Sequence, residues 1–405
     1  MYRQNDKLAI NGGKQVRTRL FAPWPSYEAD EIAAASAVLR SGKVNYWTGN
    51  QGKLFEKEFA TATRNTHAIA VANGTVALEL ALYALQIGVG DEVIVPSRSF
   101  VASASSVVMR NATPVFADIN EESQTLTGET IERVVTKNTK AIIAVHLAGW
   151  PCKMDGILSV AHKYNLKVIE DCAQAQGASY QGRPVGSFGD AAAFSFCQDK
   201  IMSTGGEGGM LVTSKDDVWR RAWSFKDHGK SVDAVRALTA SYKFEWLHKS
   251  VGTNWRLTEM QSAIGRCLLS KLKTYVKKRR SNATYLNHQL KTLPALRVTI
   301  PFRETFHSYY KYYAFVRPEL FRDGWDRDKV LLAVRAEGIP CFSGSCSEIY
   351  LEEAFLPSLR PQQRLAVARR LGETSLMFLV HPTLGEEEMN DVYLALKKVL
   401  VKASV

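Results

Sequence analysis

The stretch FSFCQDK at residues 194–200, followed by GGEGG at residues 205–209, gives the strongest indication of fold in this chain. The apolar run at residues 191–196 predicts a short buried strand that ends shortly before Lys200. The glycines that follow allow the backbone to pack closely around that lysine. A lysine in such a loop loses part of its hydration, which favours the neutral amine that Schiff-base chemistry requires.

A carboxylate follows a second apolar run. Residues 168–171 read VIED, so Asp171 also lies at the C-terminal end of a predicted strand. A lysine and an aspartate at such strand ends are the pair that a pyridoxal phosphate enzyme needs. The lysine binds the aldehyde, and the aspartate keeps the pyridine nitrogen protonated so that the ring accepts electrons. The residues therefore predict a pyridoxal phosphate site with Lys200 and Asp171 as its catalytic residues.

Strands and helices alternate over the first 200 residues. Strands are predicted at residues 91–96, 114–118, 141–146, 167–171 and 191–196, and helices at 30–40, 54–63, 76–86, 101–110 and 155–164. This alternation predicts an α/β fold with a mostly parallel sheet and helices on both faces. Ligands bind beyond the carboxyl ends of the strands in such sheets, which is where Phe100, His146, Asp171 and Lys200 are expected.

The pattern changes after residue 258. A long helix is predicted at residues 259–288, then a strand at 309–317 and helices at 326–337, 361–374 and 386–400. We therefore expect a large domain at residues 1–262, of which residues 1–26 form an N-terminal arm, and a smaller α/β domain at 263–405.

Four further residues at or near the predicted strand ends suit the cofactor. Gly74 and Thr75 begin a helix, whose free N–H groups and dipole attract a phosphate, although a simple turn and cap has the same sequence. Ser195 lies in an apolar strand and is either a second phosphate donor or a buried serine bonded to backbone. Phe100 is either a stacking partner for the cofactor ring or a core side chain. Because these residues occur together with Lys200 and Asp171, a cofactor site is favoured over a simple cap, a buried serine and a core phenylalanine.

Composition and charge indicate which kinds of partner suit the protein. The chain has 46% hydrophobic and 23% charged residues and a net charge of +12. The basic run KLKTYVKKRR at residues 271–280 continues a helical pattern and lacks the aromatic interleaving typical of RNA-binding proteins, so we expect a solvated helix face and no nucleic-acid partner. The positive charge is better suited to anionic small substrates.

The N-terminal segment and the cysteines predict an intracellular protein. The first 11 residues lack the apolar core of a signal peptide, and no apolar stretch approaches a membrane-spanning length, so we expect a cytoplasmic protein without membrane insertion. The six cysteines are scattered without C-x-x-C spacing, which predicts reduced thiols and no metal site.

The chain resembles the DegT/StrS-type aminotransferases, which are fold-type I pyridoxal phosphate enzymes that aminate keto-sugars. The segments that carry the resemblance are GDEVIVPS at residues 90–97, ATPV at 112–115, VHLAG at 145–149, VIEDCAQA at 168–175, Ser195 with Lys200, GEGG at 206–209, GTNWRLTE at 252–259 and HPTL at 381–384. The resemblance covers nearly the whole chain and implies a large domain built on a seven-stranded type of sheet.

The resemblance also implies a role for each matching residue. Lys200 is implied to hold the cofactor and then to shuttle a proton, Asp171 to pair with the pyridinium nitrogen and Gln174 to contact the cofactor on the same face. The implied phosphate ligands are Gly74, Thr75 and Ser195, with Phe100 stacked on the ring. Asn254 is implied to reach the phosphate of the neighbouring subunit's cofactor, since members of the family build each site across a homodimer.

Two segments depart from the family pattern. Trp150 stands where members often have a smaller or imidazole side chain, and CFSGSC at residues 341–346 replaces a loop rich in His and Pro. Both regions are expected near the sugar, so we predict that Trp150, His146 and Phe342 bind substrate.

The predicted function is transfer of an amino group from glutamate or glutamine to a keto-sugar. The expected acceptor is nucleotide-linked, for surface polysaccharide or secondary-metabolite synthesis. An acidic oxo-sugar, such as a keto-octulosonate, and an inosose remain alternatives. A sugar dehydratase of the same fold is disfavoured because that chemistry goes with a histidine in place of Lys200. A non-catalytic cofactor-binding regulator would not require both Lys200 and Asp171.

Overall fold

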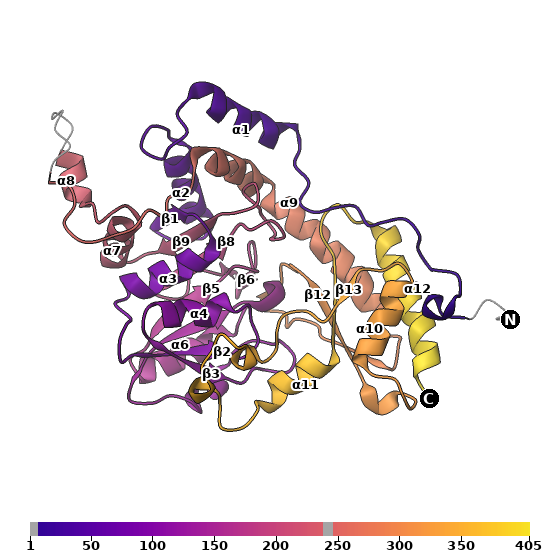
Figure 1. Ribbon diagram of the computed structural model, residues 1–405. Coiled ribbons are helices and arrows are strands. Elements are labelled where there is room, and N and C mark those ends of the chain that lie inside the picture. The colour runs from indigo at the N-terminus through magenta and orange to yellow at the C-terminus, as the bar shows by residue number, and fades with distance from the viewer. Residues whose placement is uncertain (1–6, 238–245) are drawn as a thin grey trace.

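The computed structural model describes residues 7–237 and 246–405 and contains a central sheet of seven strands (Figure 1). The strand order is β1-β9-β8-β5-β4-β2-β3. The strands are β1 (His67–Val71), β2 (Glu92–Pro96), β3 (Thr113–Ala117), β4 (Thr139–Val145), β5 (Lys167–Asp171), β8 (Ala191–Ser195) and β9 (Gly209–Thr213). Only β9 runs antiparallel to its neighbours within this sheet. The predicted mostly parallel α/β fold is confirmed.

Helices cover both faces of this sheet. The helices of this part of the chain are α1 (Ala29–Ser41), α2 (Gln51–Ala62), α3 (Gly74–Ala84), α4 (Ala102–Met109), α5 (Gly128–Glu132), α6 (Met154–Lys163), α7 (Asp216–Lys226), α8 (Val232–Ala237) and α9 (Glu259–Leu290). Of these, α8 extends away from the sheet beyond α7 (Figure 1). Along β2, Val93 and Val95 pack into one core cluster with α3 and α4, whereas Ile94 packs into another with α6. A strand that is buried on both faces needs a continuous apolar run, which is what residues 93–95 supply.

The structure contains four elements of the large sheet layer that the sequence pattern did not predict, namely the strands β1 and β9 and the helices α5 and α7. Each of the two strands is only five residues long and lies at or next to the sheet edge. A short apolar run has no periodicity that distinguishes a strand from a buried helical turn, so such strands escape a sequence reading. The predicted elements recur with ends shifted by a few residues.

The C-terminal elements form a second, antiparallel sheet with the order β10-β12-β14-β13. Its strands are β10 (Leu296–Val298), β12 (Tyr312–Val316), β13 (Cys341–Phe342) and β14 (Ser375–Phe378), packed against α10 (Arg327–Ala336), α11 (Ala366–Thr374) and α12 (Glu386–Ala403). A three-stranded sheet of β11 (Thr305–Phe306), β6 (Ser179–Tyr180) and β7 (Arg183–Pro184) joins the two parts of the chain. The 3-10 helices are Ala9–Asn11, Leu147–Gly149, Pro318–Leu320, Ile349–Leu351 and Pro357–Leu359.

The N-terminal arm lies along the C-terminal part of the fold (Figure 1). Leu8 is buried in the cluster formed by α12 and the second sheet. The Arg17 guanidinium forms ion pairs with Glu388 at 3.0 Å and Asp391 at 2.7 Å on α12. The arm therefore shares a core with the small sheet, while the domain boundary near residue 262, which falls inside α9, stays a prediction. Among the described helices none is both long and apolar enough to cross a membrane.

Candidate active site

The predicted catalytic residues meet at one edge of the central sheet. Asp171 is the last residue of β5, and Ser195 is the last residue of the adjacent strand β8. Lys200 follows β8 and is half-buried. The parallel pairing of β5 with β8 places these ends side by side, as expected for an α/β sheet.

The Asp171 carboxylate is buried and held at both oxygens. Its Oδ2 accepts a hydrogen bond from the Ser103 hydroxyl at 2.8 Å, and its Oδ1 accepts one from the Ala173 backbone N–H at 3.1 Å. Burial raises the pKa of Asp171, and the hydrogen bonds from Ser103 and Ala173 together with the Lys200 charge counteract that rise. The hydrogen bonds thus orient the Asp171 carboxylate, and the Lys200 charge favours its ionised form. A partner for a protonated ring nitrogen needs both properties.

Lys200 is fixed by residues that sequence reasoning missed. The Trp24 indole Nε1–H donates a hydrogen bond to the Lys200 carbonyl at 2.8 Å. The Lys200 Nζ lies 4.9 Å from the centroid of the Tyr310 ring, and the Tyr310 hydroxyl donates to the neighbouring Asp199 carboxylate. Trp24 belongs to the arm and Tyr310 to the second half of the chain, and no local motif marks either residue as part of a site.

The start of α3 forms an anion cradle. The Asn73 side chain accepts a hydrogen bond from the Val76 N–H at 3.0 Å, while the N–H groups of Gly74 and Thr75 have no hydrogen-bond partner among the described residues. A Cβ added to Gly74 would lie 2.6 Å from the Ser195 Cβ. The absence of a side chain at Gly74 therefore leaves room for an anion beside two N–H groups and the hydroxyls of Thr75 and Ser195. The Ser195 oxygen accepts the Cys197 N–H at 3.3 Å, so its own proton remains to be donated.

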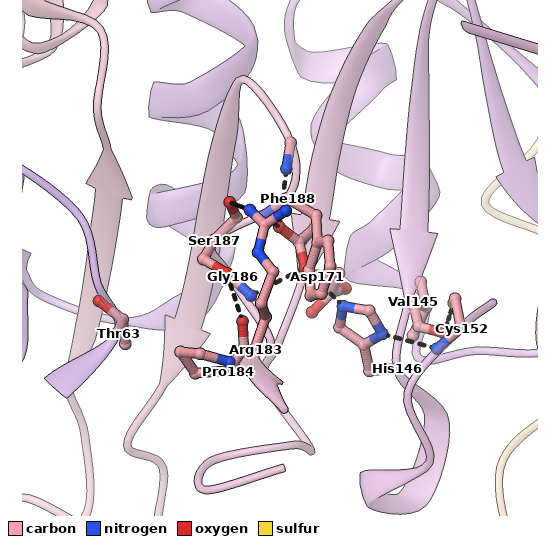
Figure 2. Close-up of polar contacts among 12 residues, drawn as sticks. Thr63, Val145, His146, Cys152, Asp171, Arg183, Pro184, Gly186, Ser187 and Phe188 are labelled. Carbon is pink, nitrogen blue, oxygen red and sulfur yellow. Dashed lines mark hydrogen bonds and ion pairs between the residues drawn. The ribbon is translucent and has the colours of Figure 1, made fainter. Parts of the chain in front are cut away.

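His146, predicted to bind substrate, is instead fully buried (Figure 2). Its Nδ1 accepts a hydrogen bond from the Cys152 N–H at 3.0 Å, so Nε2 carries the proton and donates to Glu170 at 3.0 Å. No ring atom is left for a sugar. The prediction for His146 is wrong for this structure, because a polar side chain at a strand end can also turn inward when a buried partner satisfies it.

Glu170 is that buried partner. Its carboxylate also accepts hydrogen bonds from three backbone N–H groups, at distances of 2.7 to 2.8 Å, from Gly186, Phe188 and Gly189. Burial opposes ionisation, but the hydrogen bonds from His146 and from the Gly186 and Gly189 N–H groups lower the pKa of Glu170 overall. Ligand atoms of His146, Glu170 and Cys172 come within 4.8 Å of one another. The hydrogen bonds already made occupy the oxygens that a metal would need.

Trp150 is also buried, in contrast to the prediction that it contacts substrate. Its ring centroid lies 5.4 Å from that of His307, and it lines a cavity of about 10 Å³, room for about one water molecule. Phe342 lies on β13, partly exposed, with the Arg335 guanidinium 5.8 Å from its ring centroid. Neither residue contacts Lys200 or Asp171. The other end of the predicted loop does reach the site, because the Cys346 carbonyl accepts the Ser99 N–H at 3.2 Å.

The remaining predicted site residues occupy different places around this edge. Gln174 is buried, and its Oε1 accepts a hydrogen bond from the Ala148 N–H at 2.8 Å. Phe100 precedes α4 and is 63% exposed, so its ring is available to a planar partner. Asn254 is exposed and pairs through its backbone with Asp227. The structure leaves their contacts with a cofactor as predictions.

These features fit pyridoxal phosphate, which needs an amine, a carboxylate for its ring nitrogen and a cradle for its phosphate. Gly74, Thr75 and Ser195 are placed to hold the phosphate, and Asp171 and Lys200 to face the ring. A seven-stranded, mostly parallel sheet with such a lysine, aspartate and phosphate cradle at the carboxyl ends of its strands defines the class of fold-type I pyridoxal phosphate enzymes.

Comparison with known proteins identifies the family. A model of the DegT/DnrJ/EryC1/StrS aminotransferase family matches residues 25–397. A UDP-N-acetyl-3-dehydro-alpha-D-glucosamine 3-aminotransferase from Acidithiobacillus ferrooxidans is 37% identical over 87% of this chain and 89% of its own. GDP-perosamine synthase from Escherichia coli O157:H7 is 38% identical over 65% of this chain and 68% of its own. The chain belongs to the DegT/DnrJ/EryC1/StrS aminotransferase family and is a pyridoxal phosphate-dependent aminotransferase.

Solved structures agree with this assignment. An aminotransferase from Psychrobacter cryohalolentis is 50% identical, with a TM-score of 0.92 over 94% of this chain and 99% of its own. DesI, solved in the presence of its TDP-sugar product, is 26% identical with a TM-score of 0.84 over 98% of this chain and 97% of its own. The fold and the enzyme class predicted from the sequence are confirmed.

Proposed function

We propose that this enzyme transfers an amino group from glutamate or glutamine to a keto-sugar linked to a nucleotide. The observation that carries the proposal is the similarity, over 87% of the chain, to an aminotransferase named for a UDP-linked dehydro-sugar. The second relative is named for a GDP-linked amino sugar. We infer a cytoplasmic role in the synthesis of a surface polysaccharide or a secondary metabolite.

The charge of the molecule supports an anionic acceptor. The net charge of +12 gives a positive field that attracts a nucleotide diphosphate. At the site, Lys311 is largely buried beside Asp199, with its Nζ 3.5 Å from the Asp199 carboxylate, in addition to Lys200. Three cations, Lys200, Lys311 and Arg279, lie near the two carboxylates of Asp199 and Asp171. The excess of one positive charge suits a phosphate or carboxylate group of the substrate.

The chain's own residues divide the chemical work. Bound pyridoxal phosphate supplies an electron sink, which stabilises negative charge on the carbon that gains or loses a proton. Lys200 is the group placed to hold the cofactor and to carry that proton as a general base. The Asp171 carboxylate holds the proton at the ring nitrogen, and the start of α3 holds the phosphate. The Trp24 indole holds the Lys200 backbone, and the Tyr310 ring lies beside the Lys200 amine.

We also propose that the active unit is a homodimer in which Asn254 completes the partner's site. Asn254 is exposed, and Val251, in the same segment, is 88% exposed. Trp246 is 83% exposed. Large apolar side chains are seldom displayed together on a monomer's surface, so this segment suits a subunit interface. An asparagine that only ends a backbone bridge would have the same local geometry.

Mixed oligomers test the shared site. A Lys200→Ala chain and an Asn254→Ala chain are each expected to be poorly active, but a dimer of one with the other has one intact site. After mixing and refolding at equal amounts, activity should approach about one quarter of wild type if the chains pair at random. No recovery, or full activity of a monomer at high dilution, would contradict the shared site.

A half-reaction screen tests the substrates. The cofactor absorbance of the enzyme is expected to change on addition of glutamate or glutamine alone and to return on addition of the correct acceptor. The acceptors to compare are UDP-N-acetyl-3-dehydro-alpha-D-glucosamine, a nucleotide-linked 4-keto-6-deoxy sugar, an acidic oxo-sugar and an inosose. Return with a nucleotide-linked sugar supports the proposal, whereas return only with a free acid or an inosose would replace it.

A further inference from the structure

Helix α4 brings a buried serine onto the predicted cofactor partner. Ser103 is 1% exposed and lies in the first turn of α4, three residues after Phe100. Its hydroxyl is 2.8 Å from the Asp171 Oδ2, and a second hydroxyl, that of Ser99, is 2.8 Å from Ser103. The three groups form a continuous chain of hydrogen bonds inside the protein.

The direction of this chain is fixed by chemistry. An ionised carboxylate only accepts hydrogen bonds, so the Ser103 hydroxyl must donate its single proton to Asp171. The Ser103 oxygen can then only accept from the Ser99 hydroxyl. The order of donation is therefore Ser99 to Ser103 to Asp171, and each hydroxyl strengthens the next by polarising it.

This contact controls the orientation of the carboxylate. The torsion that rotates a carboxylate is broad, because it joins a tetrahedral to a planar carbon. The Ala173 N–H holds Oδ1, and Ser103 holds Oδ2, so both oxygens of Asp171 are restrained. Without Ser103 only one restraint remains, and a buried oxygen loses its partner at a cost comparable to that of a charge-assisted hydrogen bond.

The segment that carries Ser99 is itself held from the second half of the chain. The Ser99 N–H donates to the Cys346 carbonyl at 3.2 Å, and the Ile349 N–H donates to the Ser97 carbonyl at 2.9 Å. Between them, the buried Arg98 donates from Nη2 to the Ser375 hydroxyl at 3.0 Å. The position of Ser99 is therefore set by three hydrogen bonds between residues 97–99 and the second half of the chain.

Helix α4 carries a second buried serine, Ser106, whose hydrogen bonding differs from that of Ser103. Ser106 is also fully buried on α4, but its hydroxyl has no hydrogen-bond partner among the described residues. The same helix thus offers one serine bonded to Asp171 and one that is not. This contrast supplies a matched control.

We propose that Ser103, oriented by Ser99, is a positioning residue that holds the Asp171 carboxylate toward the ring nitrogen of the cofactor. The proposal rests on the role of Asp171 in the proposed function. It gives the start of α4 two roles at the same site, since Phe100, just before the helix, would stack on the cofactor ring and Ser103 holds the carboxylate.

The test compares Ser103→Ala, Ser99→Ala, Ser106→Ala and Asp171→Asn in the full-length enzyme, loaded with pyridoxal phosphate labelled with ¹⁵N in the ring. The ¹⁵N chemical shift reports directly whether the ring nitrogen is protonated. Ser103→Ala should shift the resonance part of the way toward that of Asp171→Asn and lower kcat about tenfold or more, with the KM for the amino donor nearly unchanged. Ser99→Ala should produce a smaller change in the same direction, and Ser106→Ala none.

An unchanged resonance in Ser103→Ala would overturn the proposal, as would an equal shift in Ser106→Ala. If Ser103→Ala does not fold, as judged by circular dichroism, Ser99→Ala decides in the same way. Failure of Asp171→Asn itself to shift the resonance would instead refute the role of Asp171, so the two failures are distinguishable.

Discussion

Gly74 and Ser195 are in such close contact that no side chain fits between them: a Cβ on Gly74 would lie 3.1 Å from the Ser195 hydroxyl oxygen and 2.6 Å from its Cβ. Gly74 begins α3 and Ser195 ends β8, so the contact joins a helix N-terminus to a strand end. The two residues are far apart in sequence, and their proximity creates the cradle for the cofactor phosphate.

Gly74→Ala is expected to weaken cofactor binding about tenfold or more, because the added methyl group must displace Ser195 or the start of α3. The dissociation constant of pyridoxal phosphate, measured by fluorescence or absorbance titration, checks this. Gly88→Ala is the control, since its Cβ would meet nothing closer than 3.7 Å and its backbone is unstrained. Equal affinity in both variants would remove Gly74 from the cradle.

Lys200→Ala should leave a folded protein that still binds the cofactor but does not attach it covalently. Loss of the amine that holds the cofactor and carries the proton is expected to lower turnover by at least about a thousandfold. Borohydride reduction followed by mass spectrometry checks the covalent link, and a transaminase assay checks turnover. Lys140→Ala, at an exposed lysine near the start of β4, is the control. Turnover within tenfold of wild type would contradict the assignment.

Asp171→Asn should be nearly as damaging, with activity reduced about a hundredfold or more. An amide cannot balance the charge of a protonated ring nitrogen. Its NH2 group cannot accept a hydrogen bond, so it cannot replace both carboxylate oxygens that accept from Ser103 and Ala173. The half-reaction with glutamate, followed by stopped-flow absorbance, measures the effect. A normal rate in this variant would show that the carboxylate is not the ring's partner.

Trp150→Ala is expected to act through stability, since the indole is buried against His307. Truncating a buried tryptophan costs about 3–5 kcal/mol, so the midpoint of urea unfolding should fall and both half-reactions should decline together. Trp150→Phe should retain most of the stability. Loss confined to the acceptor half-reaction, with an unchanged midpoint, would restore Trp150 as a substrate contact.

Acid should destabilise the fold through His381. Burial, with the charges of Arg279 and Lys311, lowers the pKa of His381 to about 3, whereas an unfolded histidine titrates near 6.5. The stabilising contribution is complete above about pH 6.5 and is lost as the pH falls toward 3, because only the unfolded chain takes up the proton. The loss approaches about 1.4 kcal/mol per pH unit.

Urea unfolding at several pH values between about 4 and 7.5 measures this dependence. His381→Gln should flatten it, and His162→Gln, at an exposed histidine, should not. An identical pH dependence in His381→Gln and wild type would show that His381 does not carry the linked proton.

Much of the architecture could be predicted from local patterns. Apolar runs such as residues 93–95 predict strands buried on both faces, and their alternation with helices predicts the parallel sheet. Lys200 and Asp171 follow two of these strands, so their convergence at one edge follows from the rule that parallel strands end on the same side. The capping sequence at residues 73–75 predicts the start of α3 correctly, with Asn73 as its cap.

The direction of individual side chains was decided by tertiary structure alone. His146 and Asp171 both lie at strand ends, yet only Asp171 faces the site, because Glu170 and Cys152 satisfy both nitrogens of His146 in the interior. Trp150 is likewise turned inward against His307. A sequence shows which groups can form hydrogen bonds, but the choice between water and a buried partner depends on what the fold brings near.

The sequence by itself determined the cofactor, the mostly parallel character of the sheet and the two residues predicted to carry the chemistry, since each depends on residue type and position relative to a strand end. Tertiary structure alone placed Trp24 on the Lys200 backbone, Tyr310 beside its amine and Ser103 on Asp171. These contacts join residues from the arm, the segment before β12 and α4. No local pattern encodes them, because they arise only when packing brings distant segments within hydrogen-bonding distance.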